Sequence, residues 1–344
     1  MNVSRAATGA FGIAAAIGLL AGCSGGSQSA LAPSSGTASG ARAMVRSGKV
    51  SPTTVKRSTA GAISHGKSWA VKGAAGNSLL YITNTGNGTV TFYAYHNGTV
   101  GALAGTLTGF SYPGQPCVDK AGNVYIPDYL LSNVQEYAHG GTTPLQVLVP
   151  GGTGCSVDKT TGNLAVANFG LGTVSVYAGG TGVPTTYLTT PYADPEYAAY
   201  DNAGNLFIEG NAVPGGFVAE LLSGGSTVTN LTLSGFAITF PGNIQWGGTY
   251  LLVGDQGTPG TQLSSINQTK VSGTTVTLVN NRVFTGSTDI TGYWKRGAPN
   301  YAHVAASDYG AGTANTYTFP ALSLVQSLGA SNGISSPFGA TVSP

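Results

Sequence analysis

Charged residues are scarce in this chain of 344 residues, which has only 14 basic and 12 acidic side chains. There is no acidic residue before Asp119, and the whole chain has four histidines and three cysteines. The hydrophobic fraction of 41% suffices for a core, which excludes wholesale disorder. Zinc-site spacing, Walker motifs and Gly-x-Ser-x-Gly are all missing, so the common metal, nucleotide and serine-hydrolase signatures are excluded.

Helix signals and long hydrophobic runs are also rare beyond the N-terminus. Glycine, by contrast, is abundant with 54 residues, and Thr, Asn and Tyr recur between short apolar stretches. This composition is typical of many short β-strands joined by tight turns. The length fits one large all-β domain or two average domains.

The N-terminus has the pattern of a secretory leader. An apolar run, Ala6–Leu20, follows a basic residue and is too short to span a bilayer. The run leads into the letters LAGC, which resemble the bacterial lipoprotein signal; an ordinary leader with a chance cysteine is the alternative. The resemblance implies removal of residues 1–22 and acylation of Cys23, for instance by palmitate. It predicts a lipid anchor in the bacterial cell envelope outside the cytoplasm, and Ser24 leaves the outer membrane open as a destination.

Residues 23–72 are rich in Ser, Gly and Ala, contain half of the basic side chains and show no sustained period. They predict a flexible basic tether that reaches on the order of 40 Å from the membrane. Attraction to an anionic membrane surface is the alternative role of the basic residues. The rest of the chain has no basic clusters among aromatic residues, so nucleic acid is not an expected partner.

Three segments of residues 73–344 repeat one pattern, which is a short strand, a turn and an apolar strand. They are CVDKAGNVYIPD (117–128), SVDKTTGNLAVAN (156–168) and AYDNAGNLFIEG (199–210). An aspartate opens each turn, and a glycine supplies the positive φ that a tight hairpin needs. The aspartates are Asp119, Asp158 and Asp201, and the glycines are Gly122, Gly162 and Gly204.

The units recur with a period of about 40–50 residues and four short strands each, which predicts an all-β, six-bladed β-propeller over residues 73–344. Seven blades are the alternative, because residues 256–300 are poorly patterned. The first unit lacks a first strand, whereas the chain ends on a strand, Phe338–Val342, that has no partner. Since native proteins avoid open edges, we expect this strand to pair with Leu79–Thr83 and close the ring.

The repeats also resemble known families. LYITNTGNGTVTFY (80–93) and LAVANFGLGTVSVY (164–177) look like the YVTN repeats of bacterial surface-layer-type propellers, and GNVYIPDYLLSNVQEY (122–137) looks like an NHL repeat. The likeness is at the level of repeats and covers most of residues 73–344. It implies a β-propeller and says little about a ligand, because this fold hosts many functions.

An Asn or Asp stands at the end of most of the second strands. One interpretation is a polar ring at a channel mouth that could hold a cation such as Ca²⁺ or a polar ligand. The interpretation that we favour is that each short side chain caps the turn that follows. The residues are Asn84, Asp128, Asn168, Asp255 and Asp308.

Asp194 and Glu196 form the best carboxylate pair for acid–base or metal chemistry, although a proline-containing loop with solvated charges is the preferred explanation. His96 and His139 are expected in outer hairpin turns far from the axis, and His303 on an inner strand. We assign no catalytic or metal-binding residue and expect no cofactor.

Cys117 and Cys155 are the cysteines that remain once Cys23 is acylated. Both are predicted on the innermost strands of consecutive blades, and an oxidising compartment favours a disulfide between them. Two buried free thiols are the alternative, because a disulfide requires Cα atoms within about 7 Å.

These features favour a membrane-tethered propeller that binds or scaffolds an envelope protein, a glycan or a small ligand. A metal-dependent enzyme of the propeller lactonase or lyase kind is one alternative, and would use carboxylates at the channel mouth. A structural surface-coat protein is the other, and is suggested by the YVTN resemblance.

Overall fold

The computed structural model describes residues 78–189, 194–258, 261–295 and 302–344. The predicted leader, the predicted tether and Cys23 lie outside the described residues. Inside these ranges the helices are two single 3₁₀ turns, η1 (Ala178–Gly180) and η2 (Ala330–Asn332). No helix there has the length and apolarity needed to cross a membrane.

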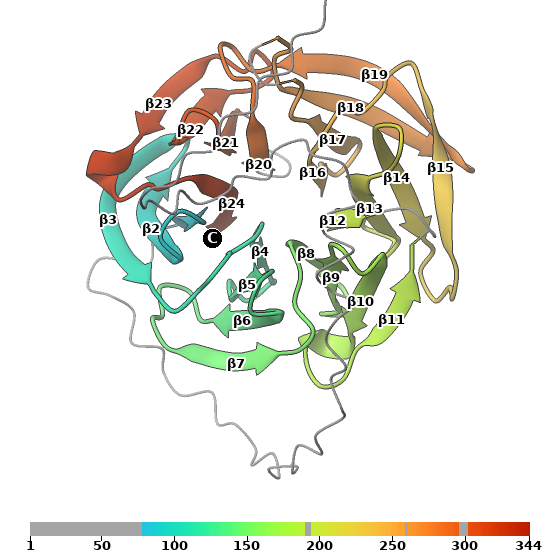
Figure 1. Ribbon diagram of the computed structural model, residues 1–344, viewed down its shortest axis with the longest axis horizontal. Coiled ribbons are helices and arrows are strands. Elements are labelled where there is room, and N and C mark those ends of the chain that lie inside the picture. The colour runs from blue at the N-terminus through green and yellow to red at the C-terminus, as the bar shows by residue number, and fades with distance from the viewer. Residues whose placement is uncertain (1–77, 190–193, 259–260, 296–301) are drawn as a thin grey trace, which may run out of the picture.

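The chain folds into an all-β propeller, with sheets arranged around a central axis (Figure 1). Four sheets have four strands each, and the strand of each sheet that is named first lies nearest the axis. The first sheet contains β24 (Pro337–Ser343), β1 (Ser78–Asn84), β2 (Thr89–His96) and β3 (Thr99–Leu107). The second contains β4 (Cys117–Val118), β5 (Val124–Asp128), β6 (Asn133–Tyr137) and β7 (Pro144–Leu148). The third contains β8 (Gly154–Val157), β9 (Leu164–Asn168), β10 (Thr173–Tyr177) and β11 (Thr185–Leu188). The last contains β20 (Ile290–Lys295), β21 (His303–Asp308), β22 (Thr313–Thr318) and β23 (Leu324–Leu328).

One sheet has eight strands, because two successive meanders join at their outer edges. The first meander is β12 (Asp194–Tyr200), β13 (Leu206–Asn211), β14 (Gly216–Leu221) and β15 (Val228–Ser234). The second is β16 (Pro241–Trp246), β17 (Leu251–Asp255), β18 (Ser265–Ser272) and β19 (Thr275–Val283). A short parallel pairing of β15 with β19 links them. The blade count therefore depends on whether this sheet is taken as one blade or two.

The predicted closure of the ring is confirmed. Strand β24 pairs antiparallel with β1, in a register that places Leu79 opposite Ser343 and Thr83 opposite Gly339. The C-terminus consequently lies near the axis beside the first strand of the described chain (Figure 1). Since every residue of β24 is buried, the last strand is part of the core and not an exposed edge.

The core is divided among the interfaces between neighbouring meanders. The second strands β5, β9 and β17 are buried along their whole length, which confirms that they are apolar because both faces are covered. The innermost strands touch one another in a continuous ring from β24 through β4, β8, β12, β16 and β20 back to β24. Side chains on these strands therefore meet at the axis.

The predicted turn chemistry is also confirmed. Gly122, Gly162 and Gly204 have φ values of 92°, 77° and 82°. In the first of these turns Asp119 accepts a hydrogen bond from the Asn123 backbone N–H at 2.8 Å. Asp201 accepts the equivalent bond from the Asn205 N–H at 2.9 Å, and Asp158 accepts from the Thr160 N–H instead. These three turns lie at the same end of the axis.

Candidate functional site

The axis of the propeller contains a cavity of about 1060 Å³. It extends from the innermost strands to the turns that follow them, so Asp119, Asp158 and Asp201 lie at its rim. The inner part of its wall includes Gln115 and both cysteines. This size is at the upper end of the range of about 300–1,000 Å³ that is usual for small-molecule sites.

Two halves of the cavity wall differ in chemistry. Three successive innermost strands, β12, β16 and β20, each contribute a large aromatic side chain near their ends: Tyr200, Trp246 and Trp294. The opposite half comes from β24, β4 and β8 and has small side chains, the two cysteines and the lysines of the turns, Lys120 and Lys159. The cavity thus has one aromatic wall and one wall whose rim carries charges of both signs, because Asp119 and Asp158 stand beside the two lysines.

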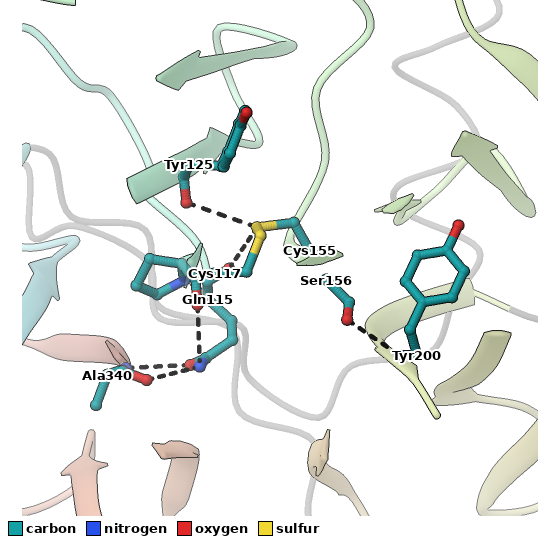
Figure 2. Close-up of a disulfide and its surroundings, with 8 residues drawn as sticks. Gln115, Cys117, Tyr125, Cys155, Ser156, Tyr200 and Ala340 are labelled. Carbon is teal, nitrogen blue, oxygen red and sulfur yellow. Dashed lines mark hydrogen bonds between the residues drawn. A yellow bond between two sulfur atoms is a disulfide. The ribbon is translucent and has the colours of Figure 1, made fainter. Parts of the chain in front are cut away.

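Cys117 and Cys155 form a disulfide that connects β4 to β8 in the cavity wall (Figure 2). The sulfur atoms are 2.09 Å apart and the Cα atoms 5.5 Å apart. The Cys155 sulfur also contacts the carbonyl oxygens of Tyr125 and Gln115, at 3.5 and 3.7 Å. Since β4 consists of only two residues, the disulfide is its main lateral attachment to the third sheet.

One end of the cavity is closed by a belt of hydrogen bonds, in which Gln115 is central. Its side-chain amide donates to the Ala340 carbonyl at 2.8 Å, and the Ala340 N–H donates back at 3.1 Å (Figure 2). Its backbone N–H donates to the Thr153 carbonyl at 2.7 Å. The Thr153 hydroxyl in turn donates to the Glu196 carbonyl at 2.9 Å, which extends the belt from the first to the fourth meander.

The belt continues to its starting point through an aromatic residue. Tyr197 donates its hydroxyl hydrogen to the Thr291 carbonyl at 2.5 Å, and the Thr291 hydroxyl donates to the Phe338 carbonyl at 2.8 Å. The rings of Tyr197 and Phe338 are stacked at 6.4 Å. A Cβ atom on Gly292 would lie 2.3 Å from the Gln115 side-chain oxygen, so the axis is filled at this level. The cavity is therefore blind, with this belt as its floor.

The five residues of the predicted polar ring are buried and do not line the cavity. Asp128 accepts hydrogen bonds from the backbone N–H groups of Ser111, Tyr112 and Leu131. The other four make different contacts. Asn84 accepts from the distant Ser335 N–H and Asn168 donates to the hydroxyls of Thr173 and Ser175, whereas Asp255 accepts from the N–H groups of Thr239, Phe240 and Gly257, and Asp308 from that of Ala311. Asp128, Asp255 and Asp308 thus each bond to the turn that follows, as the favoured interpretation expects, and Asp128 and Asp255 also bond to residues that precede them.

Asp194 and Glu196 lie at the start of β12, on the opposite side of the belt from the cavity rim. Burial, together with the nearby charge of Asp194, raises the pKa of Glu196 to about 8. Its carboxylate accepts a hydrogen bond from the Asn211 side chain. The pair is therefore partly buried and locally bonded, in contrast to the expected solvated loop.

A third carboxyl group, Glu209 on β13, is not among the predicted site residues. It is fully buried, and neither oxygen has a well-formed hydrogen bond within the described residues. Burial raises its pKa well above the ordinary value, the charges of Asp255 and Glu196 raise it further, and the backbone N–H of Gly242 lowers it only in part. The protein environment therefore favours the neutral form of this acid over its charged form.

The expectation that His96 and His139 lie far from the axis is wrong. His96 lines the axial cavity, and His139 forms a 2.6 Å hydrogen bond with Ser343 on the innermost strand β24. His303 stands on β21, the second strand of its sheet, and lines the cavity as well. The turns between the third and fourth strands of the sheets that carry His96 and His139 approach the inner strand β24 or the cavity rim, which strand order alone does not reveal. Among the described residues, no three His, Cys, Asp or Glu side chains form a group that could hold a metal ion.

Sequence reasoning also missed the aromatic wall. Tyr200 follows the repeat, but Trp246 and Trp294 fall in the two weaker copies, where the turn signals are poor. Each of these three aromatic residues stands shortly before the second strand of its repeat unit. Because that position places a side chain at the axis, it is the signal in the sequence that could have identified the aromatic wall.

Comparison with protein families found no match, and comparison with curated proteins found none either. Solved structures share the fold at low sequence identity. A chain of a nidogen–laminin complex has a TM-score of 0.61 and 13% identity, over 78% of this chain and 98% of its own. A Bacteroides caccae protein of unknown function has a TM-score of 0.58 and 13% identity, over 77% and 98%. A protein described as a 6-phosphogluconolactonase candidate from Bacteroides fragilis has a TM-score of 0.51 and 12% identity, over 78% and 85%. These similarities establish the propeller fold alone.

Proposed function

We propose that this protein is a lipid-anchored, extracytoplasmic β-propeller that binds a ligand of the cell envelope in its axial cavity. The observation that carries the proposal is the blind cavity itself, which combines a wall of partly exposed aromatic rings with charged and polar groups at its rim. Concave sites with apolar walls and a few polar groups are where proteins usually hold small ligands.

We count six blades in this propeller. The eight-stranded sheet divides into two meanders with the same strand order as the other sheets. Only three residue pairs, between β15 and β19, join the two halves. Six clusters of buried residues are found in the described part of the chain, one at each interface between neighbouring meanders. A six-bladed ring explains both observations.

The envelope location is supported by the leader and the LAGC sequence with its acceptor Cys23. The disulfide between Cys117 and Cys155 is in keeping with an oxidising compartment. Metabolic labelling with a palmitate analogue tests the anchor. We expect label in the membrane fraction for the wild-type chain and none for Cys23→Ser. Equal labelling of the two, or a wild-type chain found in the cytosol, would contradict the location.

Binding is tested with the intrinsic fluorescence of the full chain, because two of its three tryptophans line the cavity. A protein-free hydrolysate of envelope polysaccharide, separated by size, serves as the first probe. We expect a saturable change in emission with the wild type and a reduced change with Trp246→Leu. The lactonase-like and surface-coat hypotheses remain alternatives; a saturable metal-dependent hydrolysis of a lactone by the wild-type chain would favour the former.

A further inference from the structure

We propose that the disulfide between Cys117 and Cys155 is a redox-sensitive latch on the wall of the axial cavity. A small dithiol that enters the cavity opens this latch, and the β4 side of the wall then loosens while the ring stays closed. The latch goes beyond the proposed function, and only its effect on binding rests on that function. The inference follows from how the segment around β4 is held and from where the disulfide lies.

Strand β4 has less backbone pairing than the other innermost strands. It meets β5 at two register positions, those of Cys117 and Val118. The equivalent pairings of β8 with β9 and of β24 with β1 contain four and six positions. Because backbone hydrogen bonds between strands accumulate with the number of paired positions, the attachment of β4 to its own sheet is the weakest in the inner ring.

Hydrogen bonds hold the two ends of the segment 115–122, whereas the disulfide holds its middle. At the end near the belt, the Gln115 backbone N–H donates to the Thr153 carbonyl at 2.7 Å. At the end near the rim, the Ser343 hydroxyl donates to the Gly122 carbonyl at 2.6 Å, which ties the hairpin turn to β24. Towards β8, the strand β4 itself is joined by the covalent bond (Figure 2).

The disulfide can be reached from solvent through the cavity. Cys117 and Cys155 both line the cavity, and their exposed fractions are 8% and 5%. The volume of about 1060 Å³ leaves room for a small dithiol beside the wall. A disulfide can exchange with a thiol only where the attacking sulfur reaches it, so its place in the cavity wall makes reduction possible in the folded protein.

The opening reaction is thiol–disulfide exchange with a small dithiol as the reductant. One thiolate of the dithiol attacks a sulfur of the disulfide, the bond between Cys117 and Cys155 breaks, and a mixed disulfide forms. The second thiol of the reductant displaces the attacked sulfur and closes a disulfide within the reductant. Two electrons and two protons thus pass to the protein, which then has two thiols. The Cys155 sulfur lies 3.5 Å from the Tyr125 carbonyl oxygen, which can accept the new S–H group.

Reduction should loosen one wall and leave the ring intact. Without the covalent bond, the middle of the segment can move away from β8. The pairing of β24 with β1 and the bonds between Gln115 and Ala340 involve no sulfur, so the ring and the floor of the cavity remain. In an oxidising compartment the latch is closed, and a supply of dithiol opens it. A ligand that contacts this wall should therefore bind more weakly to the reduced protein.

The test is hydrogen–deuterium exchange of the full chain with and without dithiothreitol. Alkylation without denaturant, followed by mass spectrometry of peptides, reports the thiols of Cys117 and Cys155 separately from that of Cys23. The double variant Cys117→Ser/Cys155→Ser represents the open latch. Cys23→Ser is the matched control, because it removes a cysteine outside the latch. The wild type is measured in both redox states, so the result does not depend on how well the double variant folds.

We expect dithiothreitol to make both latch thiols alkylatable in the folded wild type. Exchange in residues 116–121 and 155–158 should become faster by about tenfold or more, because a disulfide usually contributes more free energy than a tenfold change represents. The equivalent turn at residues 200–205 should be unchanged, and heating should still give one cooperative transition. The double variant should exchange fast in the same segments with or without reductant, and Cys23→Ser should respond like the wild type.

Thiols that stay closed to alkylation until urea unfolds the protein would overturn access through the cavity. Faster exchange spread evenly over all sheets, or no faster exchange after reduction, would overturn the local latch. The effect on binding is measured with the envelope polysaccharide hydrolysate and tryptophan emission. Equal responses in the two redox states would overturn the control of binding. A response that is absent in both states would contradict the proposed function, while alkylation and exchange still decide the latch.

Discussion

At the scale of single residues, two features near the axis depart from ordinary packing. Glycines of the belt leave no room for a side chain: a Cβ atom on Gly292 would lie 2.3 Å from the Gln115 side-chain oxygen and 2.7 Å from the Phe338 carbonyl oxygen. Glu209 is the reverse case, because its carboxyl group is buried without a well-formed hydrogen bond among the described residues. Both features have measurable consequences for stability.

Replacing Gly292 by alanine should lower the free energy of unfolding by about 1–3 kcal/mol, because the added methyl group must displace backbone of β24. Gly329→Ala is the matched control, since no atom lies within 4 Å of its Cβ position. Urea unfolding of the two variants measures the difference. Equal midpoints would show that the axis is not filled at the belt.

Glu209→Gln should stabilise the protein more at pH 8 than at pH 5. The pKa of Glu209 is raised in the folded protein, so above the ordinary pKa the unfolded chain releases a proton that the folded chain keeps. The wild type therefore loses stability as the pH rises, by up to about 1.4 kcal/mol per pH unit, until the folded pKa is reached. Glutamine removes this loss. Urea midpoints at both pH values give the difference, and a stabilisation that does not grow with pH would refute a raised pKa of Glu209 in the folded protein.

At the scale of secondary-structure elements, β4 is the weakest part of the inner ring. It has two residues and pairs with β5 through only two register positions. The disulfide to β8 and the Gln115 contacts with Ala340 hold the segment in place. The cavity wall at this point thus depends on a covalent link more than on strand pairing.

The double variant Cys117→Ser/Cys155→Ser should lower the free energy of unfolding by about 2–4 kcal/mol, as is usual for loss of a native disulfide. Adding a reductant should lower the free energy of unfolding of the wild type by the same amount. It should leave the free energy of unfolding of the double variant unchanged. Alkylation followed by mass spectrometry, without reductant, reports the state of the thiols. Two alkylated cysteines in the native protein would mean that the link does not form in solution.

The repeated units, the turn aspartates and glycines and the last strand could be predicted from the sequence, because each depends on local patterns or on an unpaired edge. The cavity could not. Trp246 and Trp294 lie in units whose turns lack the opening Asp, so their place at the axis was hidden. The burial of Glu209 could not be predicted either, because it depends on packing between meanders.

At the scale of the whole molecule, the two ends of the described chain depend on each other. Strand β24 forms the inner edge of the first sheet, and Phe338 also stacks on Tyr197 from another sheet. A ring that is closed in this way should unfold cooperatively, since opening one interface exposes the others.

Deleting residues 337–344 should therefore remove the sharp thermal transition, because β1 loses its inner partner and the belt loses Ala340 and Phe338. Deleting Pro344 alone is the control, since this residue is exposed and outside the strand. Circular dichroism during heating measures both. A normal transition in the longer deletion would show that the ring does not need its last strand.

Hydrogen–deuterium exchange with and without the envelope polysaccharide hydrolysate tests the central claim, that the axial cavity is where the protein binds, most directly. We predict slower exchange in the turns at the cavity rim, residues 118–123, 157–163 and 200–205, and in the strand ends that carry Trp246 and Trp294. Segments beyond the belt, such as residues 110–113 and 128–132, should exchange at unchanged rates. Protection of those segments in place of the rim, or no protection anywhere, would contradict the account.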